Sequence, residues 1–301
     1  MLEDLLLSRS AVDRAAHVRS DAAWHAERLG DPNTLILHAG ANTVAVVDGP
    51  QVLLRPAPTV DVVGALSFLG IDADGRAYYA THDEIDLPAD AQWRNLREIG
   101  HRIDDVAAGL TTTAVALHNW RERTRFCPTC GGPLTITQSG WAMHCPVDGL
   151  EIFPRTDPAI IVLVRDRDDR AMLGRQVTWD RGRFSTFAGF VEAGESAEAA
   201  VRREVEEETG IRIGPAVEDL QYLGSQPWPF PCSLMLGYHA WTDHTEIRVD
   251  ADEIAEAYWF TRDELADAVA SGEVLLPPQV SVSRRLIERW FGGPLRNAPK
   301  P

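Results

Sequence analysis

The hydrophobic pattern is clearest in the second half of the chain, where it predicts a sheet flanked by helices. The run 159–164 (AIIVLV) is continuously apolar and follows Asp157-Pro158, which is typical of a fully buried strand. The charged segment 165–170 predicts a turn, and 171–175 predicts the strand that returns from it. Further strands are expected at 221–223 and 234–241.

Three helices are predicted between and after these strands. Segment 196–209 is strongly helical, with Ser196 as the N-cap and Gly210 at the position of a C-cap glycine. Segment 261–270 begins with a capping box formed by Thr261 and Glu264. The last helix is expected at 282–291.

The first third of the chain gives weaker signals for a mixed α/β unit. Segments 43–48 and 51–55 flank Gly49-Pro50 and predict a hairpin. A strand is expected at 78–81, and a loosely periodic helical region at 93–123. We assign no chemistry to this region, so scaffold or subunit contact is its expected role.

Composition narrows the class of protein. The chain has 301 residues and a formal charge of −16, so we expect two domains and no non-specific grip on nucleic acid, which requires clustered Lys and Arg. No stretch is apolar enough to span a membrane, and the acidic N-terminus does not resemble a targeting peptide. These features predict a cytoplasmic protein without a membrane partner.

Carboxylates gather on one face of the predicted helix 196–209. Glu204, Glu207 and Glu208 have the spacing i, i+3, i+4, which brings like charges within a few ångströms of one another. A hard divalent cation such as Mg²⁺ or Mn²⁺ would neutralise them and retain sites for water and substrate phosphates. Arg203 is placed to hold one glutamate. The alternative for the acidic run alone is a solvated helix face.

The cysteines suggest a second metal site, of structural type. Cys127 and Cys130 are followed, after 14 residues, by Cys145 and Asp148, which is the spacing of a zinc ribbon with two ligand-bearing loops. A carboxylate is an unusual fourth ligand, and His144 is a nearby alternative. The opposing interpretation is a metal-free ribbon held by packing around Trp141. Cys232 is remote and is expected to be a packed thiol rather than a zinc ligand.

The segment 225–233 reads SQPWPFPCS and combines stiffness with aromatic rings. Its three alternating prolines fix φ and remove backbone donors, which predicts an extended segment that cannot be a central strand. Trp228 and Phe230 should then project in similar directions and offer flat faces for a planar base. A surface loop with its rings tucked into the core is the alternative.

The stretch from Gly189 to Ile211 resembles the Nudix box, GX5EX7REUXEEXGU, at every specified position. This resemblance implies an α/β fold in which a Nudix α/β/α sandwich follows an N-terminal mixed α/β domain and a zinc-ribbon-like insert. The implied boundaries are 1–123, 124–155 and 156–301. It also implies hydrolysis of a nucleoside diphosphate derivative by water activated at Mg²⁺ or Mn²⁺. By resemblance, the metal ligands are Ala188, through its carbonyl, with Glu204, Glu208 and Glu253, and Glu207 or Glu208 assists the attacking water.

SQPWPFPCS after this box is similar to the NADH pyrophosphatase subfamily, in which Gln usually stands at the position of Cys232. The resemblance implies an NAD diphosphatase that cleaves NAD(H) to NMN(H) and AMP and removes NAD caps from RNA 5′ ends. It further implies a homodimer and a structural Zn²⁺. Arg97 is our candidate for a basic contact to the adenosine or phosphate end, and a surface salt bridge is the alternative for this residue. The implied substrate-binding residues are Phe153, Phe190, Gln226, Pro227, Trp228, Pro229, Phe230, Pro231, Cys232, Ser233 and Ser283.

Two other functions are compatible with the same sequence. One is a Nudix pyrophosphatase of different specificity, acting on ADP-ribose or a dinucleoside polyphosphate. The other is a non-catalytic module that senses NAD, although such modules tend to lose the carboxylates that are present here.

Overall fold

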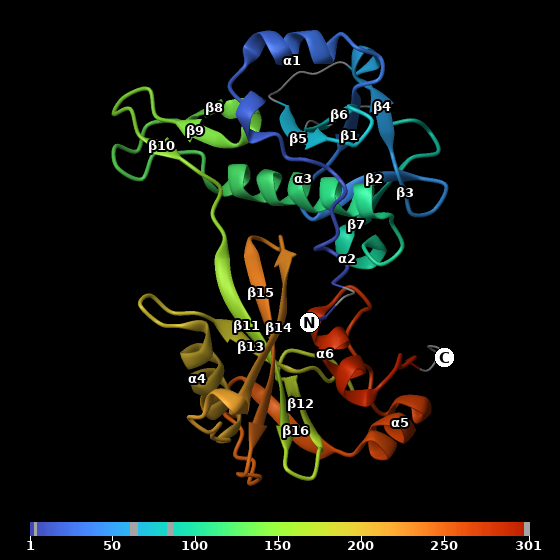
Figure 1. The fold of residues 1–301 in the computed structure, drawn as a ribbon, viewed down its shortest axis with the longest axis vertical. Helices are drawn as coiled ribbons and strands as arrows, with labels where there is room; N and C mark the ends of the chain where they lie inside the picture. Colours follow the sequence, from blue (N-terminus) through green and yellow to red (C-terminus); the bar gives the residue numbers. More distant parts are fainter. Residues whose placement is uncertain (3–4, 61–65, 83–86, 298–301) are drawn as a thin grey trace. The chain divides into compact units, whose positions relative to one another are not determined.

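The computed structural model describes residues 1–2, 5–60, 66–82 and 87–297, and its contacts divide the chain into two compact units (Figure 1). The C-terminal unit comprises Met1–Leu5, Asp157–Gln226 and Leu234–Pro301. The N-terminal unit comprises Leu6–Thr156 together with Pro227–Ser233. Most of the aromatic motif 225–233 therefore belongs to the N-terminal unit, although its sequence lies far downstream of the rest of that unit.

The C-terminal unit is built on a six-stranded sheet with helices on both faces. The strand order is β14-β15-β11-β12-β16, and β13 pairs with β11. The strands are β11 (Asp157–Asp166), β12 (Ala171–Gln176), β13 (Phe187–Phe190), β14 (Leu220–Trp228), β15 (Ser233–Thr242) and β16 (Ile254–Phe260). The helices are α4 (Ala197–Thr209), α5 (Arg262–Ser271) and α6 (Val282–Phe291).

Alternation along β11 explains this layering. Ile160 and Val162 pack into a core with Val201 and Val205 of α4. Ile161 and Leu163 point to the opposite face and pack with α5 and α6. Because successive side chains of a strand face opposite ways, a continuous apolar run serves both cores. The prediction of an α/β sandwich is confirmed, and in Figure 1 α4 lies on one side of this sheet and α5 and α6 on the other.

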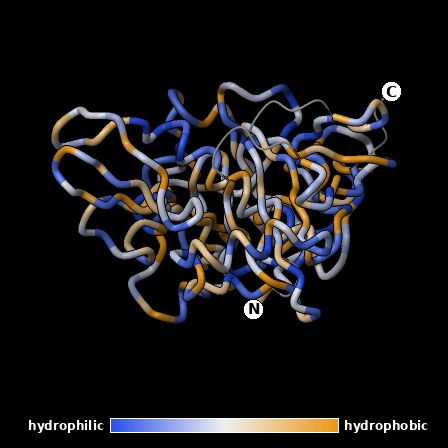
Figure 2. The backbone as a smooth tube through the Cα atoms, turned by 90° about the horizontal axis from the view of Figure 1, so that it is seen from above, coloured by the Kyte–Doolittle hydropathy of each residue, from blue (hydrophilic) through white to orange (hydrophobic). Residues whose placement is uncertain are grey.

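The N-terminal unit contains two small sheets, with orders β4-β1-β6-β5 and β3-β2-β7, and a long helix. Their elements are η1 (Ala16–Val18), α1 (Ala22–Leu29), β1 (Leu35–His38), β2 (Thr43–Val47), β3 (Gln51–Val52), β4 (Leu54–Pro56), η2 (Ala57–Thr59), β5 (Ser67–Ile71), β6 (Ala77–Thr81), β7 (Gln92–Asn95), α2 (Leu96–Ile99) and α3 (Asp105–Arg123). A three-stranded ribbon follows, with β8 (Thr135–Thr137), η3 (Gln138–Gly140), β9 (Ala142–His144) and β10 (Glu151–Ile152). In Figure 2, short hydrophobic and hydrophilic stretches alternate along the backbone, as expected for many short elements.

Two predictions from the sequence need correction. Segment 93–123 is not helical throughout, because residues 92–95 form β7, which pairs with β2, and Asn95 caps the short helix α2. The aromatic motif is not extended throughout either. Its first part ends edge strand β14, as the prolines require, but the chain then turns, with the Phe230 amide donating to the Trp228 carbonyl at 2.7 Å and a cis Phe230-Pro231 peptide.

The predicted helices 196–209, 261–270 and 282–291 are confirmed, including the Thr261–Glu264 capping box. The hairpin at Gly49-Pro50 is confirmed between β2 and β3, whereas 54–56 joins the other sheet by pairing with β1. Within the part of the chain that is described, no helix has the length and apolar character needed to cross a membrane.

Candidate active site and metal-binding ribbon

Helix α4 carries the acidic residues, and its two ends are fixed by local hydrogen bonds. Ser196 Oγ accepts from the Ala199 amide at the N-terminus, and Gly210 adopts the left-handed conformation with φ of 69° at the C-terminus. At the same end, the Asp250 amide donates to the Glu208 carbonyl at 3.1 Å. This bond ties the loop before β16, which carries Glu253, to the end of α4.

The negative charges of Glu204, Glu207 and Glu253 all act on Glu208, and we call these four residues the carboxylate cluster. Glu208 is its centre: the residue is only 4% exposed, and its buried Oε2 has no hydrogen-bond partner among the described residues. Burial, followed by the negative charges of Glu204, Glu253 and Glu207, raises the pKa of Glu208 to about 8. A buried carboxylate oxygen among like charges is a chemical fit for a cation, because carboxylate oxygens are the preferred ligands of hard divalent ions.

Arg203 organises the other side of the cluster. Its guanidinium donates to both carboxylate oxygens of Glu195, at 2.9 and 2.8 Å, and to Glu204 Oε1 at 2.8 Å. It also donates to Glu207 Oε2 at 3.0 Å and to the Phe190 carbonyl at 2.9 Å. The prediction that Arg203 holds a glutamate is confirmed, and it holds three. Glu207 is thus paired and largely exposed, whereas Glu208 is unpaired and buried.

Strand β13 brings backbone groups to the same place. Ala188 lies opposite Ile161 in the antiparallel pairing of β13 with β11, and Gly189 is its neighbour. A Cβ atom at Gly189 would come within 1.9 Å of the Glu204 carboxylate carbon, so this carboxylate fills the space that a side chain would need. The resemblance-based assignment of Ala188 therefore falls on a residue next to the cluster.

Without a bound cation, the cluster should weaken the fold at alkaline pH. Below about pH 4.5 Glu208 is protonated in both the folded and the unfolded protein, so it does not change the free energy of unfolding. Between about pH 4.5 and about 8 the unfolded chain releases this proton while the folded chain retains it. The free energy of unfolding therefore falls as pH rises through this range. In metal-free buffer at pH 8.5 we expect Glu208→Gln to raise Tm by about 4–8 °C, since loss of the buried charge restores about 2 kcal/mol and 1 kcal/mol corresponds to about 2–4 °C in a domain of this size. Differential scanning fluorimetry measures this.

The same variant should lose its advantage at pH 4.5 and also when Mg²⁺ or Mn²⁺ saturates the wild type, because protonation and metal binding both remove the unpaired charge. A wild type as stable as the variant at pH 8.5 without metal would contradict the assignment of Glu208 as the centre of the cluster.

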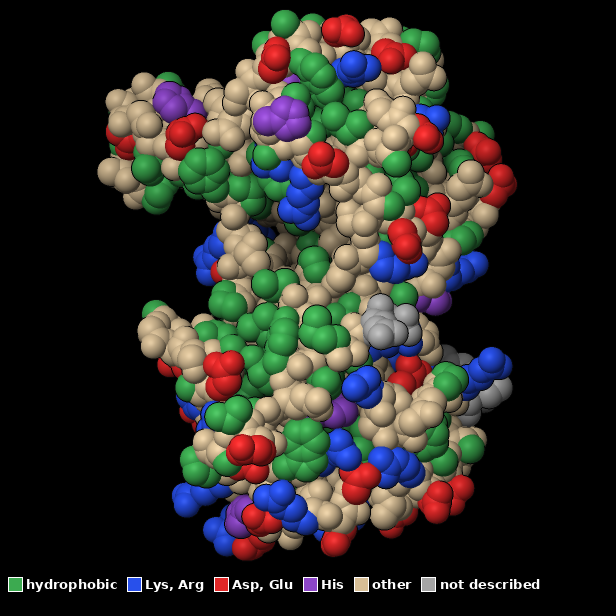
Figure 3. All heavy atoms as spheres, viewed as in Figure 1, with side chains coloured by type: hydrophobic (Ala, Val, Ile, Leu, Met, Phe, Trp, Pro, Cys, Tyr) green, Lys and Arg blue, Asp and Glu red, His purple; other side chains and the backbone are tan. Residues whose placement is uncertain are grey.

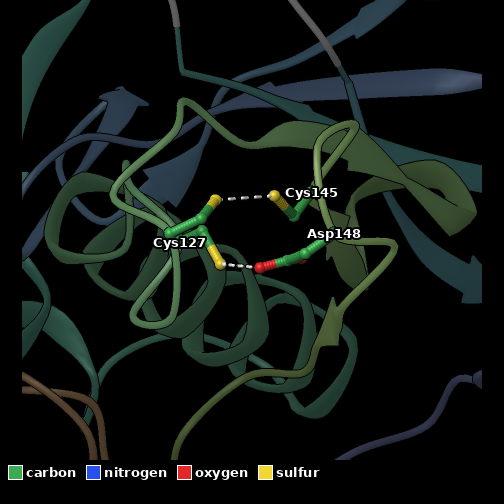
Figure 4. A group of neighbouring side chains, drawn as sticks. Cys127, Cys145 and Asp148 are labelled. Carbon is green, nitrogen blue, oxygen red and sulfur yellow. Dashed lines mark hydrogen bonds between the residues drawn. The ribbon is translucent and has the colours of Figure 1, made fainter.

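The predicted zinc ligands form a second group, the ribbon cluster of Cys127, Cys130, Cys145 and Asp148. Their four ligand atoms lie within 4.8 Å of one another, and Figure 4 shows Cys127, Cys145 and Asp148 converging. Cys127 Sγ lies 3.2 Å from Asp148 Oδ2, and Cys130 Sγ lies 3.4 Å from Cys145 Sγ. All four cysteines of the chain are free of disulfides.

Tight turns present these side chains. Gly131 and Gly149 adopt φ of 73° and 76°, and their amides donate to the Cys127 and Cys145 carbonyls at 2.9 Å. The Leu150 amide donates to Asp148 Oδ1, and this bond, with the neighbouring thiols, lowers the pKa of Asp148 to about 2. Three sulfurs and one ionised carboxylate are a donor set suited to tetrahedral Zn²⁺. His144 and Cys232 do not belong to this cluster.

Zinc content tests the ribbon directly. We expect the purified protein to hold one zinc ion per chain and Asp148→Ala to release it to a chelator at least about tenfold faster, because one ligand is lost. The exposed Asp90→Ala variant is the matched control, and Asp148→Cys should slow release below the wild-type rate. Equal release from Asp148→Ala and wild type would show that Asp148 is not a ligand.

The aromatic motif is built into the N-terminal unit. The Trp228 and Phe230 rings form an edge-to-face pair with centroids 4.9 Å apart. The Arg97 guanidinium lies over both, 5.4 Å from the Trp228 centroid and 4.4 Å from that of Phe230. Asn119 Nδ2 donates to the Pro229 carbonyl at 2.6 Å. The Arg97 guanidinium and the rings of Trp228 and Phe230 therefore lie together.

The remaining predicted substrate residues occupy different environments. Phe153 and Phe190 are 57% and 58% exposed, so neither ring is buried in a core, and they belong to different units. Gln226 is fully buried and its amide donates to the Val280 carbonyl at 2.9 Å. Ser283 is fully buried, and its hydroxyl accepts from the Thr186 amide and from Ser185 Oγ. Pro227, Pro231, Cys232 and Ser233 are half-buried, and Pro229 is buried.

Two residues beside the motif were missed by sequence reasoning. Asn119 bridges Pro229 and Asn42, and its amide donates to Asn42 Oδ1 at 3.0 Å. The signal in the sequence was an asparagine within a helical segment. The structure shows that Asn119 is buried in α3, where an amide needs specific partners. Asn42 gave none, since a polar residue between a glycine-containing loop and a strand is ordinary.

Comparison with known proteins agrees with these two sites. Residues 155–280 match the NUDIX domain family, and residues 122–153 match the NADH pyrophosphatase zinc ribbon domain. The chain is 42% identical, over 95% of its length and 94% of theirs, to the NAD-capped RNA hydrolase NudC of Mycobacterium bovis and of Mycobacterium tuberculosis. It is 38% identical to the NAD-capped RNA hydrolase NUDT12 of Pongo abelii, over 63% of this chain and 43% of that protein.

Proposed function

The chain belongs to the NudC family of Nudix hydrolases, and from that premise we propose that it hydrolyses the pyrophosphate of NAD(H) and removes NAD caps from RNA 5′ ends. Water adds to one phosphorus, the phosphoanhydride P–O bond breaks, and the products are NMN(H) and AMP, or NMN and a 5′-monophosphate RNA. The observation that carries this proposal is the carboxylate cluster with its buried, unpartnered Glu208 oxygen.

Glu204, Glu208, Glu253 and the Ala188 carbonyl would hold the divalent ion, which we propose to be Mg²⁺ or Mn²⁺. When bound, such ions neutralise phosphate oxygens and lower the pKa of water. Arg203 fixes Glu204 and Glu207 against Glu195, so the carboxylates keep their positions as substrate enters. Of the two candidate bases, Glu208 is favoured, because Glu207 Oε2 is already bonded to Arg203 whereas Glu208 Oε2 has no partner.

Specificity for a dinucleotide is proposed to come from aromatic rings and Arg97. Trp228 and Phe230 with Arg97 would receive the adenosine or phosphate end, and the exposed rings of Phe153 and of Phe190 are each proposed as contacts to the nicotinamide. The remaining contacts would be shaped by the other predicted substrate residues, Gln226, Pro227, Pro229, Pro231, Cys232, Ser233 and Ser283. Gln226 and Ser283 would act indirectly, through their hydrogen bonds to backbone groups. Assembly into a homodimer, cytoplasmic location and division of the chain at residues 123 and 155 stay predictions.

A substrate series separates this proposal from its alternatives. We expect kcat/KM for NADH to exceed that for ADP-ribose and for a dinucleoside tetraphosphate by at least about tenfold, since contacts to the second base are lost or misplaced. A preference for either competitor would favour a Nudix pyrophosphatase of other specificity. Binding of NAD without turnover of any substrate would favour the sensing module.

A further inference from the structure

A cavity of about 540 Å³ lies in the N-terminal unit beside the aromatic motif, lined by residues that include Asn42, His118, Asn119, Arg123, Phe230 and Pro231. We propose that this asparagine cavity binds the nucleotide that follows the NAD cap in capped RNA. The inference rests on the proposed function and deepens it, because it distinguishes capped RNA from free NAD(H). The volume is that of a typical small-molecule site.

The cavity shares a wall with the residues proposed to bind the cap. Phe230 and Pro231 form part of its lining, and the Arg97 guanidinium lies 4.4 Å from the Phe230 ring centroid. All of these residues belong to the N-terminal unit. A ligand seated on the aromatic pair would therefore contact part of the cavity lining within one compact unit.

The two asparagines offer a hydrogen-bonding edge that suits a base. Asn119 uses its Nδ2 donors on Asn42 Oδ1 and the Pro229 carbonyl, at 3.0 and 2.6 Å. This leaves Asn42 Nδ2 as a donor and Asn119 Oδ1 as an acceptor, and neither atom is buried without a partner. An adjacent donor and acceptor complement the edge of a nucleobase, which presents the same pair in reverse.

Two imidazole rings and one arginine are the other groups in the cavity that suit a nucleotide. The ring centroids of His118 and His82 lie 5.1 Å apart. Burial lowers the pKa of both histidines, that of His82 to about 3, so both flat rings are neutral at pH 7. Glu122 also lines the cavity, and its carboxylate is paired with Arg125. Arg123 is exposed and forms no ion pair with any described residue. Arg123 can therefore meet one backbone phosphate.

The charge of the chain favours one nucleotide rather than a long strand. With a net charge of −16, sustained contact along RNA would be repelled, and on the face shown in Figure 3 basic and acidic side chains are interspersed. A single phosphate contact predicts a shallow salt dependence, with a slope of about −0.7 in log kcat/KM against log salt for a single strand.

The test compares free NADH with NAD-capped RNAs that carry one to four nucleotides after the cap. Asn42→Asp keeps the acceptor used by Asn119 but replaces the donor with an acceptor, and Arg123→Gln removes the cation. We expect each to lower kcat/KM for capped RNA by about tenfold and to leave that for NADH unchanged. Arg102→Gln, which removes an exposed arginine of the same unit outside the cavity lining, is the matched control and should act as wild type on both substrates.

Two results would overturn the inference: wild-type activity of both variants on capped RNA, or equal losses on NADH and capped RNA, which would place the effect in the aromatic motif. Arg123→Gln should also reduce the salt slope for capped RNA by about 0.7, and an unchanged slope would contradict the phosphate contact. Because Arg123 is exposed, this variant tests the site even if Asn42→Asp does not fold. A wild type that cleaves no NADH would instead defeat the proposed function.

Discussion

Glu208→Gln is expected to lower kcat for NADH hydrolysis by about 10²–10⁴-fold at saturating Mn²⁺, the range typical for loss of a general base, with a further contribution from the lost metal ligand. The glutamine keeps the shape of the side chain but carries no charge and accepts no proton. Glu208 is the centre of the cluster because three other carboxylates surround it and its Oε2 has no partner. Steady-state kinetics with product separation measures the effect.

Glu206→Gln is the matched control for this variant. Glu206 lies on the same helix two residues away, is exposed, and pairs with the exposed Arg212. Its replacement removes the same charge outside the cluster and should leave kcat within about twofold of wild type, as expected for an exposed ion pair. Equal losses in both variants would mean that general charge, and not the position of Glu208, controls the rate.

Gly189→Ala is expected to lower kcat/KM by about 10²-fold, because displacement of a reacting group by about 1 Å costs this much. The new Cβ would meet the Glu204 carboxylate at about 2 Å, and the far end of this flexible side chain can move away. The fold should therefore survive, with Tm near that of wild type, while Glu204 leaves its position beside Arg203. The Mn²⁺ concentration for half-maximal activity should rise.

Gly293→Ala serves as the control, since among the described residues no atom beyond its two chain neighbours lies within 4 Å of the added Cβ. If Gly189→Ala lost activity only together with a large fall in Tm, the effect would be one of folding. If it kept wild-type activity and metal dependence, Glu204 would not need its observed position.

Local chemistry made much of the C-terminal unit predictable. The apolar run of β11 serves two cores, and Ser196 and Gly210 mark the ends of α4, so the strand and helix could be inferred from nearest neighbours in sequence. The ribbon cluster was predictable for the same reason, since its ligands lie in two short turns.

What could not be predicted depends on contacts between residues distant in sequence. Residues 92–95 are a strand only because β2 offers a partner, and their own pattern does not reveal it. The turn in the aromatic motif is fixed by Asn119, which is 110 residues away from Pro229. Arg203 likewise does not pair with Glu208, because its guanidinium already donates to Glu195, Glu204 and Glu207.

The most direct test of the central claim is to incubate wild-type protein with NADH and, separately, with a short NAD-capped RNA in Mn²⁺ or Mg²⁺, and to resolve the products. We expect NMNH with AMP from the first, and NMN with 5′-monophosphate RNA from the second, and we expect a chelator to abolish both reactions. Release of nicotinamide, or no cleavage of either substrate with either metal, would contradict it.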